Sequence, residues 1–177
     1  MSFIRKIERY GKTLHYPIYD RIPLIKSEGC MMRDVGTVHA LFISQHGKES
    51  PLKKSELQLD PRGIIDDKHY DTIPERTVLV TSLESYDMAF RELGVEMPHG
   101  YLGENLLIDY NPYRLPVGTH LHIGSATLEI TQNCTLCNHL STLDKRIPKL
   151  LKDDRGVFAK VVSEGTIQKG DTVSVAT

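Results

Sequence analysis

The strongest constraint on the fold is a series of short segments in which apolar and polar residues alternate. They recur from residue 36 to the end of the chain, and glycines, prolines and Asp- or Asn-rich turns separate them. The segments are GTVHALFIS (36–44), SELQLD (55–60), RTVLVT (76–81), ENLLID (104–109), THLHIG (119–124), ATLEIT (126–131), GVFAKVVS (156–163) and DTVSVA (171–176). Alternation with a period of two is typical of half-buried β-strands. The series predicts a mostly β protein, either a barrel or a sandwich.

Alternation also predicts which side chains lie on the same face of each strand. In the first segment, one face should present Val38, Ala40 and Phe42, and the other Thr37, His39 and Leu41. Gly124 and Ser125 fit a two-residue type II′ turn, because glycine accepts the positive φ of the first turn position. We therefore expect the segments on either side of this pair to form an antiparallel hairpin.

Helical patterns are few. One helix should begin at a capping box formed by Thr81 and Glu84 and end at Gly94, which sits where a C-cap belongs. Its apolar positions at helical spacing are Tyr86, Phe90 and Leu93. A second, weaker helix is predicted over residues 142–152, interrupted by Pro148.

The first 35 residues lack the alternating pattern. Ile4, Ile7 and Tyr10 have the spacing of a short helix, but Gly11 interrupts it, and Tyr16 and Ile22 precede prolines that favour extended backbone. There is no internal repeat, low-complexity tract or linker. We interpret residues 1–35 as an N-terminal arm, which either covers a site or builds a homodimer, and residues 36–177 as one β-barrel-like domain.

Composition excludes several classes of partner and location. The 177 residues carry a formal net charge of −1, so no long-range attraction to nucleic acid or an anionic membrane is expected. The first 20 residues lack the apolar core of a signal peptide, and no apolar run approaches 18 residues. These features predict a cytoplasmic protein. Three cysteines in a reducing compartment also make a structural disulfide framework improbable.

Chemistry is concentrated in TQNCTLCNHL (131–140), which follows a predicted strand and holds Cys134, Cys137 and His139. The three form a C-x2-C-x-H pattern that can bind zinc if His120 or His122 supplies the fourth ligand. Alternatively, a thiol here is reactive, with its pKa lowered by a neighbouring cation, His139 or Lys145. The cysteines can equally be small apolar core residues. The spacing alone leaves all three interpretations open.

Two further polar groups interrupt predicted strands. In GYLGENLLID (100–109), Gly103 allows close approach of a ligand, and Glu104 and Asn105 either orient that ligand or satisfy a turn. In RGIIDDKHYDTIPERTVLV (62–80), acidic residues and His69 precede Arg76. That loop suits a divalent cation or a substrate phosphate, although a solvated turn explains it equally well.

Taken together and in order, these groups resemble the MOSC domain, named for the C-terminal domain of molybdenum cofactor sulfurase. The resemblance extends from about residue 36 to residue 175, and Cys137 falls at the characteristic cysteine of the family. It rests on an ordered set of short matches, which are GTV (36–38), Gly63, DKH (67–69), Arg76, GYLGENLL (100–107), Val117-Gly118, Ile123-Gly124, TQNCTLCNHL, GVFAKVV (156–162), Gly165, Ile167, Gly170 and Asp171.

The chain departs from the family pattern at three positions. Asp66 stands where the family usually has a glycine, and a non-glycine residue adopts positive φ less readily. Leu136 replaces a proline before the cysteine. Cys134 replaces an arginine, which weakens the case for an anionic cofactor at this loop and adds a redox-active thiol.

The resemblance implies a barrel-like MOSC fold that binds a molybdenum-pterin cofactor. In related reductases of N-hydroxylated compounds the equivalent of Cys137 ligates molybdenum, and elsewhere in the family it carries sulfur. Thiolate suits both roles, because it is a soft anionic donor and can hold a persulfide. Matching positions then make Cys137 the metal ligand and catalytic thiol, with Cys134 as its resolving partner.

The other site residues follow from the same resemblance. Arg76 and Lys160 are expected to anchor a cofactor phosphate, and Gly103 and Asn105 to contact the pterin or substrate. His69 and Glu104 would orient groups or handle protons. The chain lacks a cysteine set for an iron–sulfur cluster and a Gly-rich dinucleotide motif, so catalysis needs a separate electron-donor reductase. The alternatives are a non-catalytic carrier that passes sulfur or cofactor to a molybdoenzyme or cofactor-biosynthesis protein, and a Cys/His zinc-binding domain.

Overall fold

The protein was analysed as a computed structural model that describes residues 6–9, 12–15, 32–135 and 138–176. The chain divides into two compact units, Met1–Cys30 and Met31–Thr177. In the first unit, β1 (Lys6–Arg9) pairs antiparallel with β2 (Lys12–His15), and Ile7 lies opposite Leu14. Over Ile7 the chain is therefore a strand and not a helical turn, which corrects the helical spacing considered for this segment. The boundary predicted at residue 35 stays a prediction.

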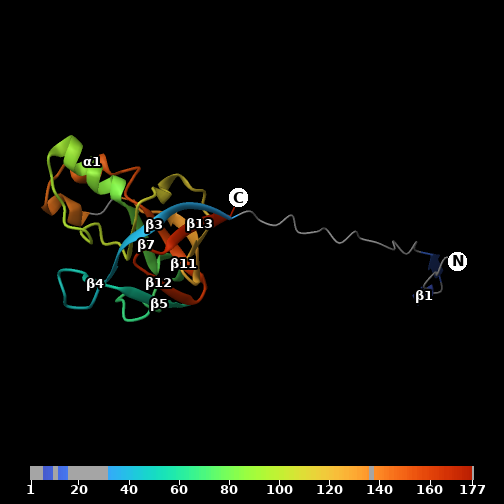
Figure 1. Cartoon of the computed structure of the whole chain (residues 1–177). Coiled ribbons are helices and arrows are strands. Elements are labelled where there is room, and N and C mark those ends of the chain that lie inside the picture. The colour runs from blue at the N-terminus through green and yellow to red at the C-terminus, as the bar shows by residue number, and fades with distance from the viewer. Residues whose placement is uncertain (1–5, 10–11, 16–31, 136–137, 177) are drawn as a thin grey trace. The chain divides into compact units, whose positions relative to one another are not determined.

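The second unit is a closed barrel of seven strands, drawn in Figure 1. All seven lie where alternation predicted strands. They are β3 (Met32–Ile43), β7 (Val78–Ser82), β8 (Leu106–Ile108), β9 (His120–Ile123), β10 (Ala126–Asn133), β11 (Val157–Ser163) and β13 (Thr172–Ala176). The order is β13-β9-β10-β11-β7-β8-β3, and pairing of β13 with β3 closes the ring. All of these pairs are antiparallel except β7 with β8. The predicted mostly β, barrel-like fold is confirmed.

Smaller elements surround the barrel. A three-stranded sheet of β12 (Gly165–Gln168), β5 (Glu56–Asp60) and β6 (Gly63–Ile64) packs on it, and β4 (Leu52–Lys54) extends β3 at an edge. Of these, only β5 was predicted. Single helical turns occupy Pro74–Arg76, Pro112–Arg114 and Asn138–Thr142. Arg76 therefore lies in the turn before β7 and not in the strand.

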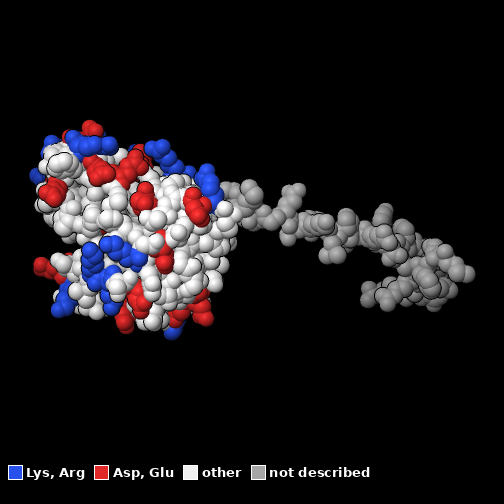
Figure 2. All heavy atoms as spheres, in the orientation of Figure 1, with Lys and Arg blue, Asp and Glu red and all other residues white. Residues whose placement is uncertain are grey.

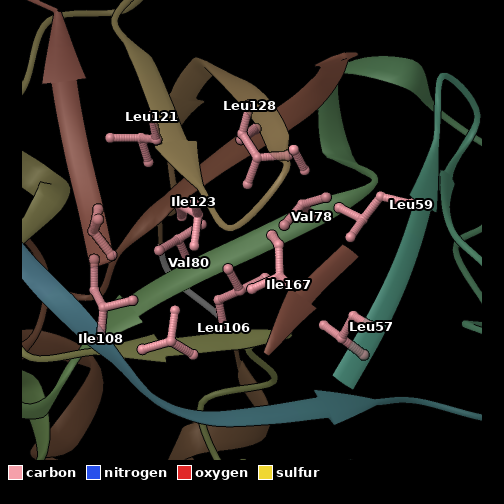
Figure 3. Packing of buried hydrophobic residues seen from close by; sticks show 14 of the residues in the cluster. Leu57, Leu59, Val78, Val80, Leu106, Ile108, Leu121, Ile123, Leu128 and Ile167 are labelled. Atoms are coloured by element: carbon pink, nitrogen blue, oxygen red, sulfur yellow. The ribbon is translucent and has the colours of Figure 1, made fainter. Parts of the chain in front are cut away.

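The barrel interior is filled by aliphatic side chains from every wall. Figure 3 shows residues of this core, including Val80, Leu106 and Ile123, converging from different strands. Ile167 from β12 and Leu57 from β5 belong to the same cluster, so the small sheet covers one side of it. All five of these side chains are essentially inaccessible to solvent. A core of this size needs no disulfide or metal to stabilise it.

Strand β3 contributes side chains to two hydrophobic cores, because a bulge lies between Val38 and Ala40. Val38 and Leu41 point into the barrel, whereas Ala40 and Phe42 pack in a second cluster with Tyr86. The predicted faces are therefore wrong for this strand. A bulge inserts an extra residue, and every side chain beyond it changes face.

The hairpin and the first helix have the predicted ends with one exception. Ile123 pairs with Ala126 across Gly124, whose φ is +58°. Helix α1 (Leu83–Leu93) ends at Gly94 in the left-handed conformation, as predicted. Its N-cap, however, is Ser82, so the predicted capping box is wrong. The second helix is shorter than predicted, since α2 spans only Ile147–Leu150 and Pro148 lies in its first turn.

Candidate functional site

Two adjoining cavities form one cleft beside the second core. The smaller, of about 310 Å³, is lined by Ser44, Lys68, His69, Thr72, Ile73, Arg76, Leu79, Leu102, Gly103, Asn105, Arg155 and Phe158. The larger, of about 680 Å³, is lined by Ser44, Lys48, Glu49, Ser50, Pro51, Lys68, Pro98, His99, Gly100, Tyr101, Leu102, Gly103, His139, Thr142 and Arg155. Five residues, including Arg155 and Lys68, line both. Cavities of this size accommodate small organic ligands.

The DKH segment forms one wall because Asp67 anchors it from inside. The Asp67 carboxylate is 5% exposed and accepts hydrogen bonds from the backbone N–H of Ser44 at 2.7 Å and of His69 at 2.8 Å. Its second partner at Oδ2 is the Asn105 amide, at 3.0 Å. A buried carboxylate with three donors is well satisfied. Asp67 is therefore a fixed support, and His69 is presented at the cavity mouth.

Burial lowers the pKa of His69, although Asp67 acts in the opposite direction. The imidazole is thus neutral near pH 7 and can accept a proton from a bound ligand. The loop that carries it is bounded by Asp66 and Asp71, with φ of +69° and +56°. Asp66 thus occupies a left-handed position where the family usually has glycine. Two non-glycine residues in this conformation mark a loop held by its surroundings.

Asn105 lies at the centre of the cleft wall, but its side chain is already engaged. The amide oxygen accepts from Leu79 N at 3.0 Å, and the amide nitrogen donates to Asp67 and to Phe42 O at 3.3 Å. These contacts join β3, β7 and the DKH loop. The structure therefore places Asn105 as a support for the site.

Glu104 points away from the cleft into the second core. It is 1% exposed, and its Oε1 accepts from Tyr86 Oη at 2.5 Å and from Gly100 N at 2.8 Å. Oε2 has no hydrogen-bond partner. Burial raises the pKa of Glu104 and is also the main cause of the raised pKa of Tyr86. Glu104 lines neither cavity, in contrast to its neighbour Gly103, at which an added Cβ would meet no atom within 4 Å.

The sequence interpretation missed Arg155, which precedes β11 and lines both cavities. Its side chain donates from Nη1 to Thr135 O and from Nη2 to Leu102 O, each at 2.9 Å. The residue is 8% exposed, its Nε has no partner, and no salt bridge to it exists within the described part of the chain. A buried, uncompensated guanidinium is costly. Arg155 is therefore a strong candidate for ligand binding. The sequence alone could not identify it, because a single arginine outside any motif forms no recognisable pattern.

Arg76 reaches the smaller cavity, as expected for a ligand-binding cation. Its guanidinium carbon lies 5.2 Å from the centre of the Phe158 ring. With the Gln132 amide turned so that its oxygen faces the guanidinium, that oxygen accepts from Nη2 at 2.8 Å and Nε at 2.6 Å. These contacts leave Nη1 available to a ligand.

Lys160 does not reach the cleft. Alternation along β11 places it on the outer face of the barrel, where its Nζ lies 3.0 Å from Glu129 Oε1. Glu129 Oε2 lies 3.5 Å from His120 Nε2. The position of Lys160 in the structure therefore does not support its predicted role as a phosphate anchor.

The cysteine segment borders the cleft on its described sides. Cys134 follows β10 directly, is 3% exposed and donates its N–H to Gly156 O at 2.8 Å. His139 is exposed, lines the larger cavity and lies 5.1 Å from the Tyr101 ring. Cys137 lies outside the described residues, as does any pairing between it and Cys134. Within residues 32–135 and 138–176, no group of three His, Cys, Asp or Glu side chains could hold a metal ion.

The described residues thus form a small closed barrel with a cation-lined cleft, and the comparisons agree with the fold. A profile of the MOSC domain matches residues 66–174, more than half of the chain. The chain belongs to the MOSC domain family, which is associated with molybdenum cofactor binding or sulfur-related functions. A search of curated proteins finds no match. No described helix is long and apolar enough to cross a membrane.

Solved structures share the fold at low sequence identity. YuaD from Bacillus subtilis superposes with a TM-score of 0.71 at 16% identity, covering 82% of this chain and 98% of that chain. YiiM from Geobacillus stearothermophilus gives 0.59 at 15% identity, covering 83% and 76%. YiiM from Escherichia coli gives 0.58 at 20% identity, covering 80% and 70%. At these identities the similarity shows the fold alone.

Proposed function

We propose that the protein binds a molybdenum-pterin cofactor in the cleft, with Cys137 as the metal ligand or sulfur carrier. The observation that carries the proposal is the position of Arg155, a buried cation without a salt bridge among the described residues. It donates to the carbonyl of Thr135, two positions before Cys137 in the chain. The family places its functional cysteine at this point of the sequence. A thiolate beside a fixed cation suits both metal ligation and persulfide transfer.

The cleft residues fit an anionic, heterocyclic cofactor. Arg76 lines the smaller cavity and would hold a phosphate. Phe158 and Leu79 supply apolar wall, and Gly103 leaves space because it has no side chain. The cofactor supplies two-electron oxygen-atom or sulfur chemistry when bound. The chain itself binds and orients it.

Proton handling falls to His69 and not to Glu104. His69 stands at the cavity mouth with a lowered pKa, so its neutral ring can take or return a proton at the bound substrate. Glu104 is sealed in the second core and keeps its hydrogen bonds to Tyr86 and Gly100. In reduction of an N-hydroxylated compound, the electrons come from a separate reductase, because no electron-transfer motif was found in this sequence.

Elemental analysis for molybdenum and zinc, with pterin fluorescence after oxidation, tests the proposal on protein from a cofactor-producing host. We expect molybdenum and pterin in wild type and in Cys134→Ser, and neither in Cys137→Ser. Wild-type protein without either would overturn cofactor binding, and persulfide on Cys137 would then indicate a sulfur carrier. Zinc that is lost together with folding in Cys134→Ser would instead indicate a zinc-binding domain. Activity with artificial electron donors separates a reductase from a carrier.

A further inference from the structure

The larger cavity is lined mainly by basic residues among its charged side chains. Lys48, Lys68 and Arg155 line it, and Glu49 is the carboxylate among its lining residues. His99 also lines it, but burial and the nearby His39 and Lys53 lower the pKa of His99, so that ring is neutral near pH 7. Figure 2 shows basic side chains gathered near β4, whose Lys53 and Lys54 are exposed. The field in this cavity therefore favours an anion.

Among the described residues, no carboxylate forms a salt bridge with Arg155. The positive charge of Arg155 acts to lower the pKa of Glu104, but burial is the larger effect and raises that pKa. The two partners of Arg155 are neutral carbonyls, those of Thr135 and Leu102. An anion that binds this guanidinium would offset its desolvation cost.

The same cavity has an aromatic wall. The rings of Tyr101 and His139 lie 5.1 Å apart at an angle of 33°, and Tyr101 Oη is 3.0 Å from Thr142 Oγ1. That hydrogen bond fixes the tyrosine ring. Pro51 and Pro98 add rigid apolar surface. Aromatic side chains held in this manner favour a planar ligand that stacks on them.

We propose that the larger cavity is a binding site for a small aromatic anion, with its phosphate or carboxylate at Arg155 and Lys68 and its ring against Tyr101. In the proposed function this molecule is the substrate, bound beside the cofactor. Its binding does not depend on that function, because the cavity is formed by the protein alone. The same chemistry could come from the pterin phosphate, so the test must separate the two sources.

Isothermal titration of the full chain purified without pterin tests the site, with phenyl phosphate, phenol and inorganic phosphate as probes. We expect phenyl phosphate to bind about tenfold more tightly than either of the others, since it uses the charge and the stacking wall together. Lys68→Met should weaken phenyl phosphate by about three- to tenfold. Tyr101→Leu should remove the preference over inorganic phosphate. Lys160→Met, outside the cleft, should bind as wild type does.

Equal binding of phenyl phosphate and phenol, or equal losses in Lys68→Met and Lys160→Met, would overturn the proposal. Repeating the titration on pterin-loaded protein identifies the source of the anion. Unchanged affinity for phenyl phosphate supports a separate substrate site, whereas competition shows that the pterin phosphate occupies it and overturns a separate site. If the protein binds no pterin at all, the proposed function fails, but the titration without pterin still decides this site.

Discussion

Arg155 and Lys160 are five residues apart in the chain, yet the structure puts them in opposite environments. Arg155 is buried at the junction of the two cavities and bonds to neutral carbonyls. Lys160 is on the outer face of β11 and pairs with Glu129, which has access to solvent. Burial strengthens every interaction of the first cation, whereas water screens those of the second. The difference teaches that a cation near a family motif matters through its environment and not through its place in the sequence.

The largest expected loss of stability comes from a change at Gly156, which lies between Arg155 and strand β11, the strand that carries Lys160. It has a φ of +135°, and a Cβ there would collide with the carbonyl oxygen of Val80. Gly156→Val should therefore reduce the free energy of unfolding by more than about 3 kcal/mol. Gly170→Ala is the control, because Gly170 has positive φ but no atom within 4 Å of an added Cβ. Denaturant unfolding measures both, and equal losses would show that backbone strain alone matters at Gly156.

Removal of the buried cation should be the next largest effect. Arg155→Met leaves the carbonyls of Leu102 and Thr135 without their donor, which costs roughly 2–4 kcal/mol of unfolding free energy. Arg155→Lys should recover part of that loss, because an ammonium can donate to one of the two. Unfolding of Lys160→Met provides the comparison. Arg155→Met as stable as wild type would mean that the two cations do not differ as described.

Glu104→Gln should change how stability depends on pH. The folded-state pKa of Glu104 is raised, so folded protein holds more protons than unfolded protein above the unfolded pKa of about 4.3. Wild-type stability should then fall, relative to the glutamine variant, as pH rises through the window between those two pKa values. Glutamine keeps an oxygen for Tyr86 and Gly100.

Glu129→Gln is the matched control for this pH effect, because Lys160 holds the pKa of Glu129 below its usual range. Its contribution is present above the unfolded pKa and is lost as pH falls through the folded pKa, so the sign is opposite. Unfolding curves between pH 3 and pH 8 compare the variants. The same slope in both would contradict the assignment of Glu104 as a buried, desolvated group.

The smallest effect should come from Lys160→Met. The ion pair with Glu129 is exposed to water, and such pairs contribute little to stability. We expect a melting temperature indistinguishable from wild type and an unchanged cofactor content. A marked loss of cofactor in this variant would instead restore Lys160 as a phosphate anchor and erase the contrast with Arg155.

Sequence patterns correctly predicted those features of the fold that depend on neighbouring residues, namely the strands and the glycine-dependent turns. Alternation located all seven barrel strands, and the Gly94 cap and the Gly124 hairpin followed from the freedom of glycine to adopt positive φ. The faces of β3 could not be predicted, because the bulge near Ala40 depends on its pairing with β8. The predicted cap at Thr81 was wrong because strand β7 continues to Ser82, which becomes the N-cap of α1.

The sequence by itself determined the class of fold and the family, because the hydrophobic period, the turn glycines and the order of the motifs are all read along the chain. Only the tertiary structure decided which charged residues share the cleft. Arg155 binds carbonyls 53 and 20 positions away, and Glu104 turns into a core that β3 and α1 complete. Such contacts depend on segments that meet only after folding, and the burial that makes a charge effective arises from the same event.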